Sequence, residues 1–146
     1  MRIQAPAERC FDLARSVEVH LAGNVHSGEQ AVALEGVSSG LLDLGQCVTW
    51  RARHFGVRWK LTSRITAFDR PGFFQDAMTR GPFGFMRHDH FFRALSSGET
   101  EMRDVFCFSA PPGLLGRAAE TAFLGRYMRG LLRERNRVLR EFAELP

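Results

Sequence analysis

The amino-acid sequence predicts one α+β domain, residues 1–146, in which an antiparallel sheet packs against a long C-terminal helix. Five strand-like segments follow one another between residues 47 and 110, and one helical pattern covers the chain after them. A length of 146 residues suits one compact domain with room for a core and a cavity. A composition that is 45% hydrophobic and 25% charged excludes a disordered chain.

Composition and charge exclude further classes of protein. No apolar run approaches the ~20 residues of a membrane span, and charges interrupt the first sixteen residues, so we expect a cytoplasmic protein. The net charge is +4, but the basic residues are spread along the chain, so we expect no nucleic-acid partner. The three cysteines, Cys10, Cys47 and Cys107, form no CxxC pair, which favours reduced thiols.

The N-terminal third predicts short elements followed by a long loop. We expect an extended segment at Arg2–Ala5, a helix over Ala7–Arg15 and a further helical turn over Val17–Ala22. Small and polar residues dominate Gly23–Gly45, with a short strand near Gln30–Leu34. Long ordered loops in small domains are often functional, so this loop is a candidate lid over a binding site.

The middle of the chain predicts an antiparallel meander, because turn residues separate successive strands by connections too short for parallel crossovers. The expected strands are Cys47–Phe55, Val57–Asp69, Phe73–Arg80, Phe83–Ser96 and Glu99–Ala110.

The last segment, Gly113–Leu145, predicts one helix of ~45 Å. Arg135 falls inside its apolar stripe, and glycines at 116, 125 and 130 leave room for a ligand or for close backbone packing. The expected stripe is Leu124, Tyr127, Met128, Leu131, Val138, Phe142 and Leu145.

Alternation along the strands assigns side chains to two faces of the sheet. One face, which includes Arg87 and Asp89, is rich in charge and is expected in solvent. The other face must pack against the helix, yet it carries ionisable groups, which must pair, stay neutral or face a wet cavity because an unpaired buried charge is costly. These groups are His54, Asp76, His88, His90 and Asp104.

The order of elements and several local motifs resemble the START-like helix-grip superfamily (SRPBCC), in particular its bacterial polyketide cyclase/dehydrase-like members. The resemblance covers nearly the whole chain and implies a curved antiparallel sheet wrapped around a long C-terminal helix, with an apolar tunnel between them. The motifs are LGQCVTWRARHFG (Leu44–Gly56), FDRPGFFQDAMTRGPF (Phe68–Phe83), HDHFF (His88–Phe92) and TEMRDVFCFSAPPGLLG (Thr100–Gly116).

The resemblance implies a protein that binds a small apolar or amphipathic ligand, lipid-, sterol- or polyketide-like, between sheet and helix. The alternative is that the same side chains are only core. The candidate ligand-binding residues are Trp50, Trp59, Phe74, Met78, Met86, Phe92, Met102, Phe106 and Arg135.

A second hypothesis is a cyclase/dehydratase-type enzyme, because histidine beside a carboxylate can transfer protons. Strand order allows His54 to pair with Asp76, and His88 or His90 to pair with Asp104, with Arg135 as an oxyanion partner. In the alternative interpretation the aspartates only neutralise buried cations. The candidate catalytic residues are His54, Asp76, His88, His90 and Asp104.

The HxH pair of His88 and His90 could also hold a metal if Asp76 or Asp104 supplied a third ligand. The motif is short, so we expect no metal and no cofactor, and two hydrogen-bonded histidines instead. A homodimer stays open.

Overall fold

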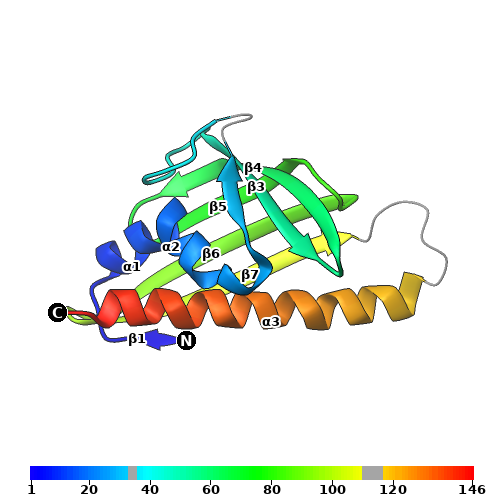
Figure 1. The fold of residues 1–146 in the computed structure, drawn as a ribbon. Coiled ribbons are helices and arrows are strands. Elements are labelled where there is room, and N and C mark those ends of the chain that lie inside the picture. The colour runs from blue at the N-terminus through cyan, green and yellow to red at the C-terminus, as the bar shows by residue number, and fades with distance from the viewer. Residues whose placement is uncertain (33–35, 110–116) are drawn as a thin grey trace.

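The computed structural model describes residues 1–32, 36–109 and 117–146, without the side chains of Ser27 and residues 117–121. It confirms the expected α+β fold, a curved seven-stranded sheet with a long C-terminal helix (Figure 1). The elements are β1 (Arg2–Ile3), α1 (Ala7–Ala14), α2 (Val17–Gly23), η1 (Val25–Ser27), β2 (Gln30–Val32), β3 (Cys47–His54), β4 (Val57–Asp69), β5 (Phe73–Arg80), β6 (Phe85–Ser96), β7 (Glu99–Ser109) and α3 (Arg117–Glu144).

All neighbouring strands are antiparallel, in the order β1-β7-β6-β5-β4-β3-β2. The order follows the sequence from β2 to β7, as the short turns predict, and β1 is added beside β7. Figure 1 shows α3 running along the sheet, with α1 and α2 near its C-terminal half. The concave face of the sheet and α3 therefore enclose the interior.

The core is concentrated at the end of the molecule where α1 packs. Phe11 of α1 is fully buried, and its ring meets Phe68, Phe74 and Phe92 edge-on at centroid distances of 5.2, 5.4 and 5.6 Å. Such edge-to-face contacts add to the stabilisation from burial. Helix α2 begins directly after α1, and the Ser16 side chain caps its start by accepting a hydrogen bond from the Val19 amide.

Helix α3 is buried most fully in its C-terminal half. The expected stripe is wrong at its end, since Phe142 and Leu145 are 40% and 57% exposed while Leu139 and Ala143 are buried. Leu139 and Ala143 are one turn apart, so they share the face that α1 and β1 cover. Of the two alternatives for the helix glycines, close backbone packing is wrong for Gly125 and Gly130, because a Cβ atom there would meet no atom within 4 Å, and Gly116 lies outside the described residues.

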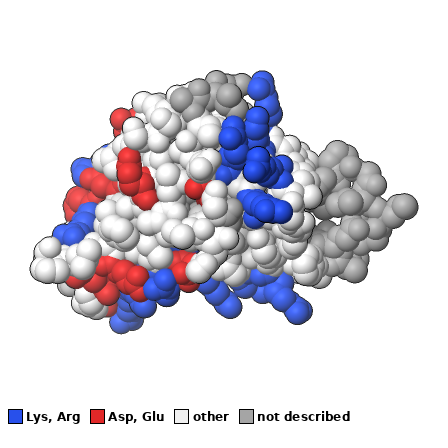
Figure 2. Space-filling model, in the orientation of Figure 1, with Lys and Arg blue, Asp and Glu red and all other residues white. Residues whose placement is uncertain are grey.

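The convex face is less solvated than expected. Asp89 is only 7% exposed, accepts a hydrogen bond of 2.7 Å from Gln75 and lies 3.2 Å from Arg87. The antiparallel pairing of β3 and β4 also brings together basic residues that are apart in the sequence: Arg51 lies opposite Lys60, and Arg53 lies opposite Arg58. Figure 2 shows one group of basic side chains at the upper right of this face, further basic ones along its lower and left edges, and most acidic ones toward the α1 end.

The candidate lid is only partly described, since residues 33–35 lie outside the described chain. The expected strand in it is present as β2, and backbone hydrogen bonds attach the following residues to their neighbours: Val37 to Cys47, Gly40 to Val17 and Leu42 to Arg15. Among the described helices, none has both the length and the hydropathy that crossing a bilayer requires.

Candidate functional site

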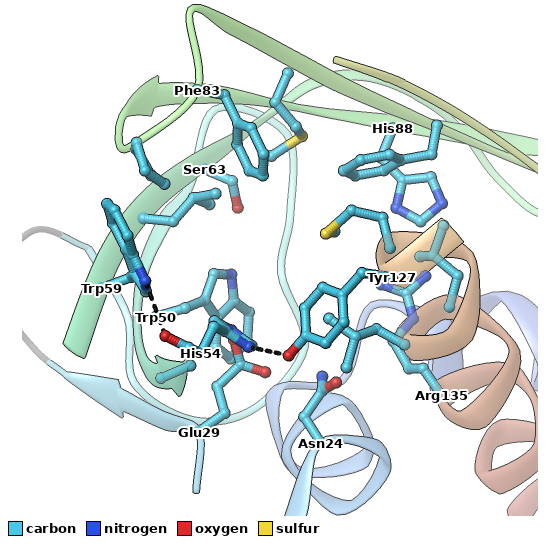
Figure 3. A pocket seen from close by; sticks show the side chains of 18 of the residues that line it. Asn24, Glu29, Trp50, His54, Trp59, Ser63, Phe83, His88, Tyr127 and Arg135 are labelled. Atoms are coloured by element: carbon cyan, nitrogen blue, oxygen red, sulfur yellow. Dashed lines mark hydrogen bonds between the residues drawn. The ribbon is translucent and has the colours of Figure 1, made fainter. Parts of the chain in front are cut away.

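A cavity of about 210 Å³ lies between the concave sheet and the middle of α3, from Leu124 to Arg135 (Figure 3). Strands β3 to β7 supply one wall and α3 the other. At its surface end, which we call the mouth, Phe55 is 57% exposed and Trp59 is also exposed. The apolar lining includes Ala52, Leu61, Phe83, Met86, Phe106, Leu124, Met128, Leu131 and Leu132.

The structure divides the nine candidate ligand-binding residues into two groups. Those on the cavity wall are Trp50, Trp59, Met86, Phe106 and Arg135. The residues that do not line this cavity are Phe74, Met78, Phe92 and Met102.

The reason for the division is the position of α1. Phe74 and Phe92 share the concave face with the cavity residues, but the Phe11 ring covers them. Met102 is 1% exposed in the same core, and Met78 packs where a side chain at Gly81 would stand. Alternation alone identifies the inward face, whereas the helix that fills one end of it decides which residues reach the cavity.

A cluster of ionisable groups forms the inner end of the cavity. His88 and His90 are 2% and 1% exposed on β6, between Asp76 of β5 and Asp104 of β7. His90 bridges the two carboxylates, with Nε2 at 3.1 Å from Asp76 Oδ1 and Nδ1 at 3.0 Å from Asp104 Oδ1. His88 Nε2 lies 3.4 Å from Asp104 Oδ1 without an aligned hydrogen bond to any described residue. Asn136 of α3 donates to Asp104 Oδ2.

The electrostatics of this cluster differ between the two histidines. Burial, helped by the charge on His90, lowers the pKa of His88 to about 4. Burial also acts to lower the pKa of His90, but the carboxylates of Asp104 and Asp76 outweigh it and raise that pKa. Burial alone would raise the pKa of both carboxyls, yet the histidines and Arg135 lower it. The raised pKa of His90 favours its protonated form, the lowered pKa of His88 favours its neutral form, and the lowered pKa values of the carboxyls favour carboxylates.

The cluster members face different spaces. Asp76 and His88 line the large cavity, whereas His90 lines a smaller one of about 40 Å³ on the α1 side. Arg135 and Asp76 border both cavities, and Asp104 borders neither. His88 is thus the histidine of the HxH pair that a molecule in the large cavity could touch, with Asp104 behind it.

His54 does not pair with Asp76, contrary to expectation. Its Nδ1 atom lies 2.7 Å from the hydroxyl of Tyr127 on α3, near the mouth (Figure 3). Burial lowers the pKa of His54 and raises that of Tyr127, so both groups favour their neutral forms. The cause is distance along β3: His54 is the last residue of that strand and meets the exposed half of α3.

Sequence reasoning missed several polar residues on the wall. His20 of α2 stacks on Trp50 with ring centroids 3.9 Å apart, and its Nε2 atom lies 3.1 Å from Glu29. Ser63 of β4 and Tyr127 of α3 also line the cavity. Alternation places Ser63 inward and the helical stripe includes Tyr127, so a signal for both was present, but nothing local indicates His20 or Glu29.

Arg135 is held in place by the close packing of α2 on α3. A Cβ atom at Gly23 would lie 2.8 Å from the Arg135 Cα atom, closer than real side chains approach. Only glycine therefore permits this approach, and the backbone at Arg135 is fixed as a result. The guanidinium lines the cavity, and its buried Nη2 atom has no hydrogen-bond partner among the described residues.

Asp76, His88 and His90 offer a ligand set for a metal, since one donor atom from each lies within 4.8 Å of the others. Two histidines and a carboxylate with an open side suit zinc or iron(II). The same atoms already satisfy one another, because His90 Nε2 bonds Asp76, and the nearby Arg135 cation opposes a second positive charge. The prediction that no metal binds thus stands, and elemental analysis of the purified protein tests it.

No family model matches the chain, and no curated protein matches it. Solved structures do resemble it. TTHA0849 from Thermus thermophilus is 17% identical over 97% of this chain and 91% of that chain, with a TM-score of 0.73. The Zhui aromatase/cyclase from Streptomyces sp. R1128 is 16% identical over 99% and 90%, also with a TM-score of 0.73. Major latex-like protein 151 from Panax ginseng is 11% identical over 99% and 94%, with a TM-score of 0.65.

These structures establish the fold of the chain. It has the START-like helix-grip fold, as the sequence motifs suggested. A fold of this kind carries many functions, so the activity has to be argued from the cavity.

Proposed function

We propose that the protein binds a small apolar or amphipathic molecule, lipid- or polyketide-like, in the cavity between the sheet and α3. The cavity itself is the observation that carries this proposal: a mostly apolar wall with a few polar groups, among them the cluster at the inner end, is typical of a ligand site. The names of the similar structures, an aromatase/cyclase and a latex-like protein, support a ligand or substrate of this general kind.

The volume of the cavity limits the size of the ligand. A dry engineered cavity of about 150 Å³ is large enough to hold benzene. A volume of about 210 Å³ accordingly suits a body of one or two rings, or a short acyl chain. The four fused rings of a sterol need more room, so we favour the smaller classes.

Two measurements test binding. Native mass spectrometry of the protein as purified would reveal a bound molecule and its mass. Trp50 and Trp59 line the cavity, so their fluorescence reports titration with a two-ring probe such as 2-acetylnaphthalene. We expect saturable quenching in the wild-type protein, and loss of it in Ala52→Phe, which fills the cavity from β3.

The matched control is Ala94→Phe, which adds the same side chain at an exposed position of β6. It should bind as the wild type does. Equal binding by the Ala52→Phe variant, or a wild-type protein that binds neither this probe nor any copurifying molecule, would contradict the proposal.

A second candidate function is proton transfer to or from the bound molecule. The observation that favours it is His88, a neutral imidazole on the cavity wall with the Asp104 carboxylate behind it. Such a pair can act as a general base. If the protein is a cyclase/dehydratase-type enzyme, His88→Ala should abolish turnover while binding persists. If it is a carrier, the same change should alter affinity only.

We also propose a cytoplasmic location and no nucleic-acid partner. The three cysteines are free, which suits a reducing compartment. The cavity face presents carboxylates as well as cations, a mixture that suits a small molecule better than a phosphate backbone.

A further inference from the structure

The polar end of the cavity carries information about the ligand itself. Arg135 is the cation on the cavity wall, and its Nη2 atom is buried without a hydrogen-bond partner among the described residues. Buried polar groups in folded proteins are almost always hydrogen-bonded, and an unpaired charged donor is the costliest exception. The protein thus maintains an unsatisfied donor in a residue that lines this cavity.

The nearby carboxylates do not satisfy this donor. Asp76 and Asp104 are close enough to Arg135 for its charge to lower their pKa values, but no ion pair joins either to it among the described residues. Asp76 is instead hydrogen-bonded to His90, and Asp104 accepts from Asn136 and lies 3.0 Å from His90 Nδ1. Arg135 therefore acts on the cluster at a distance, and its Nη2 atom keeps no partner among the described residues.

The backbone of Arg135 and the first part of its side chain pack closely on α2. Gly23 holds the backbone of Arg135 against α2, and a Cβ atom there would also lie 2.9 Å from the Arg135 Cγ atom. Figure 3 shows the Arg135 side chain on the same side of the cavity as Tyr127 and below His88. A fixed donor needs no reorganisation when an acceptor arrives, which favours tight and oriented binding.

A second polar residue lines the same region. His88 is on the cavity wall, and its buried Nε2 atom lies 3.4 Å from Asp104 Oδ1 without an aligned hydrogen bond to a described residue. Leucine and methionine side chains of α3 line the cavity beside Arg135. The inner end of the cavity thus combines the Arg135 cation with apolar contacts.

We propose that the ligand carries an oxygen acceptor, a carbonyl or a carboxylate, which Arg135 binds at the inner end of the cavity. The apolar body of the ligand then points toward the mouth. This inference rests on the proposed function, since it describes the molecule that the cavity holds. It excludes a pure hydrocarbon as the natural occupant.

Three probes that share one ring system measure the effect of an oxygen acceptor on binding. 2-Methylnaphthalene has none, 2-acetylnaphthalene has a carbonyl oxygen, and 2-naphthoate has a carboxylate. We expect the wild-type protein to bind at least one oxygen-bearing probe about tenfold or more tightly than 2-methylnaphthalene, the ratio that a hydrogen bond to a charged group provides. Preference for the naphthoate identifies an anionic ligand, and preference for the ketone identifies a neutral one.

Variants assign the preference to Arg135. Arg135→Met should lower the affinity for the oxygen-bearing probes to that for 2-methylnaphthalene, and the affinity for 2-methylnaphthalene itself should stay the same. Arg135→Lys, which keeps the charge, serves if the methionine variant fails to fold. Arg129→Met, at an exposed position of the same helix, is the matched control and should preserve the preference.

The outcomes separate this inference from the proposed function. If the wild type binds all three probes equally, the inference is overturned and the binding function stands. A preference that survives in a folded Arg135→Met protein equally overturns the role of Arg135, and so does a preference of unchanged size in Arg135→Lys, which lacks the planar guanidinium. If no probe binds, the proposed function fails and the inference fails with it.

Discussion

At the scale of single residues, two histidines two positions apart on one strand have opposite electrostatic roles. His90 touches both Asp76 and Asp104, and the carboxylates stabilise its proton. Of the two carboxylates, His88 is near Asp104 alone, at a longer distance, so the effect of burial is larger and lowers the pKa of His88. The difference comes from the neighbouring strands, because β5 turns its aspartate toward His90 and leaves His88 on the cavity wall.

This difference predicts a loss of stability in mild acid. The pKa of His88 is about 4 in the folded protein and ~6.5 in an unfolded chain. Between these values the unfolded chain binds more protons, so the free energy of unfolding falls as the pH falls. His88 should contribute about 2 kcal/mol of this loss between pH 7 and pH 5.

His90 acts in another pH window, because its raised pKa gives stability that is complete below ~6.5 and is lost as the pH rises. Urea unfolding at several pH values measures the slope, and His88→Gln should flatten it. Burial also lowers the pKa of His54, so His54 contributes part of the pH dependence of stability that remains in this variant. A slope that is unchanged by the His88 substitution would disprove this account.

Asp104 permits a second prediction at this scale. Its side chain is buried between His88, His90 and Asn136. Removing one partner of a buried charge pair leaves the other uncompensated, so Asp104→Asn should lower the free energy of unfolding by about 3 kcal/mol.

Glu101 is the matched control on the same strand, since its ion pair with Arg93 is exposed to solvent. Glu101→Gln should change stability little because exposed ion pairs contribute little. Urea denaturation of both variants at pH 7 makes the comparison, and similar losses in the two would count against a buried network.

At the scale of elements, α3 is one helix with two environments. Its C-terminal part packs on α1, α2 and β1, whereas its middle, from Leu124 to Arg135, borders the cavity. The contact with α2 is so close that it depends on the absence of a side chain at Gly23. The position of Arg135 in the cavity is thus set by helix packing and not by the sheet.

Gly23→Ala should therefore be destabilising, although alanine favours helices. The added methyl group would overlap the α3 backbone at Arg135, and forcing α2 away should cost about 1–3 kcal/mol. Gly130→Ala is the control, because nothing lies within 4 Å of a Cβ atom there, and it should stabilise α3 by up to about 1 kcal/mol. Thermal unfolding followed by circular dichroism compares them, and a stabilised Gly23→Ala protein would contradict the close contact.

At the scale of the whole molecule, the sequence predicts the fold better than the site. Turn residues such as those around Gly56 divide the meander correctly, since each hairpin is a local event. Alternation correctly turns His88, His90 and Asp104 inward. The cavity wall is not a local property, because Phe11 covers some inward residues and leaves others uncovered.

Contacts between residues far apart in the sequence are the other reason why the site could not be predicted completely. His54 bonds Tyr127, 73 positions away, and no periodicity in either segment indicates that contact. The stacking of His20 on Trp50 likewise depends on where α2 lies over β3. The candidate residues of the inner cluster come from adjacent strands, so strand order alone could bring them together. The residues of the mouth come from a strand end and a helix, and only the folded structure shows how far apart these elements lie.

The two ends of the chain meet far from the mouth. Arg9 donates to the Phe142 and Leu145 carbonyl oxygens at 3.1 and 2.9 Å, and the Gln4 amide donates to Glu144 at 2.9 Å, which joins both ends at one pole (Figure 1). An affinity tag or a surface tether attached at either terminus leaves the opposite pole unobstructed. Immobilised protein is consequently suitable for screening small-molecule libraries, with the screened compounds approaching from the free side.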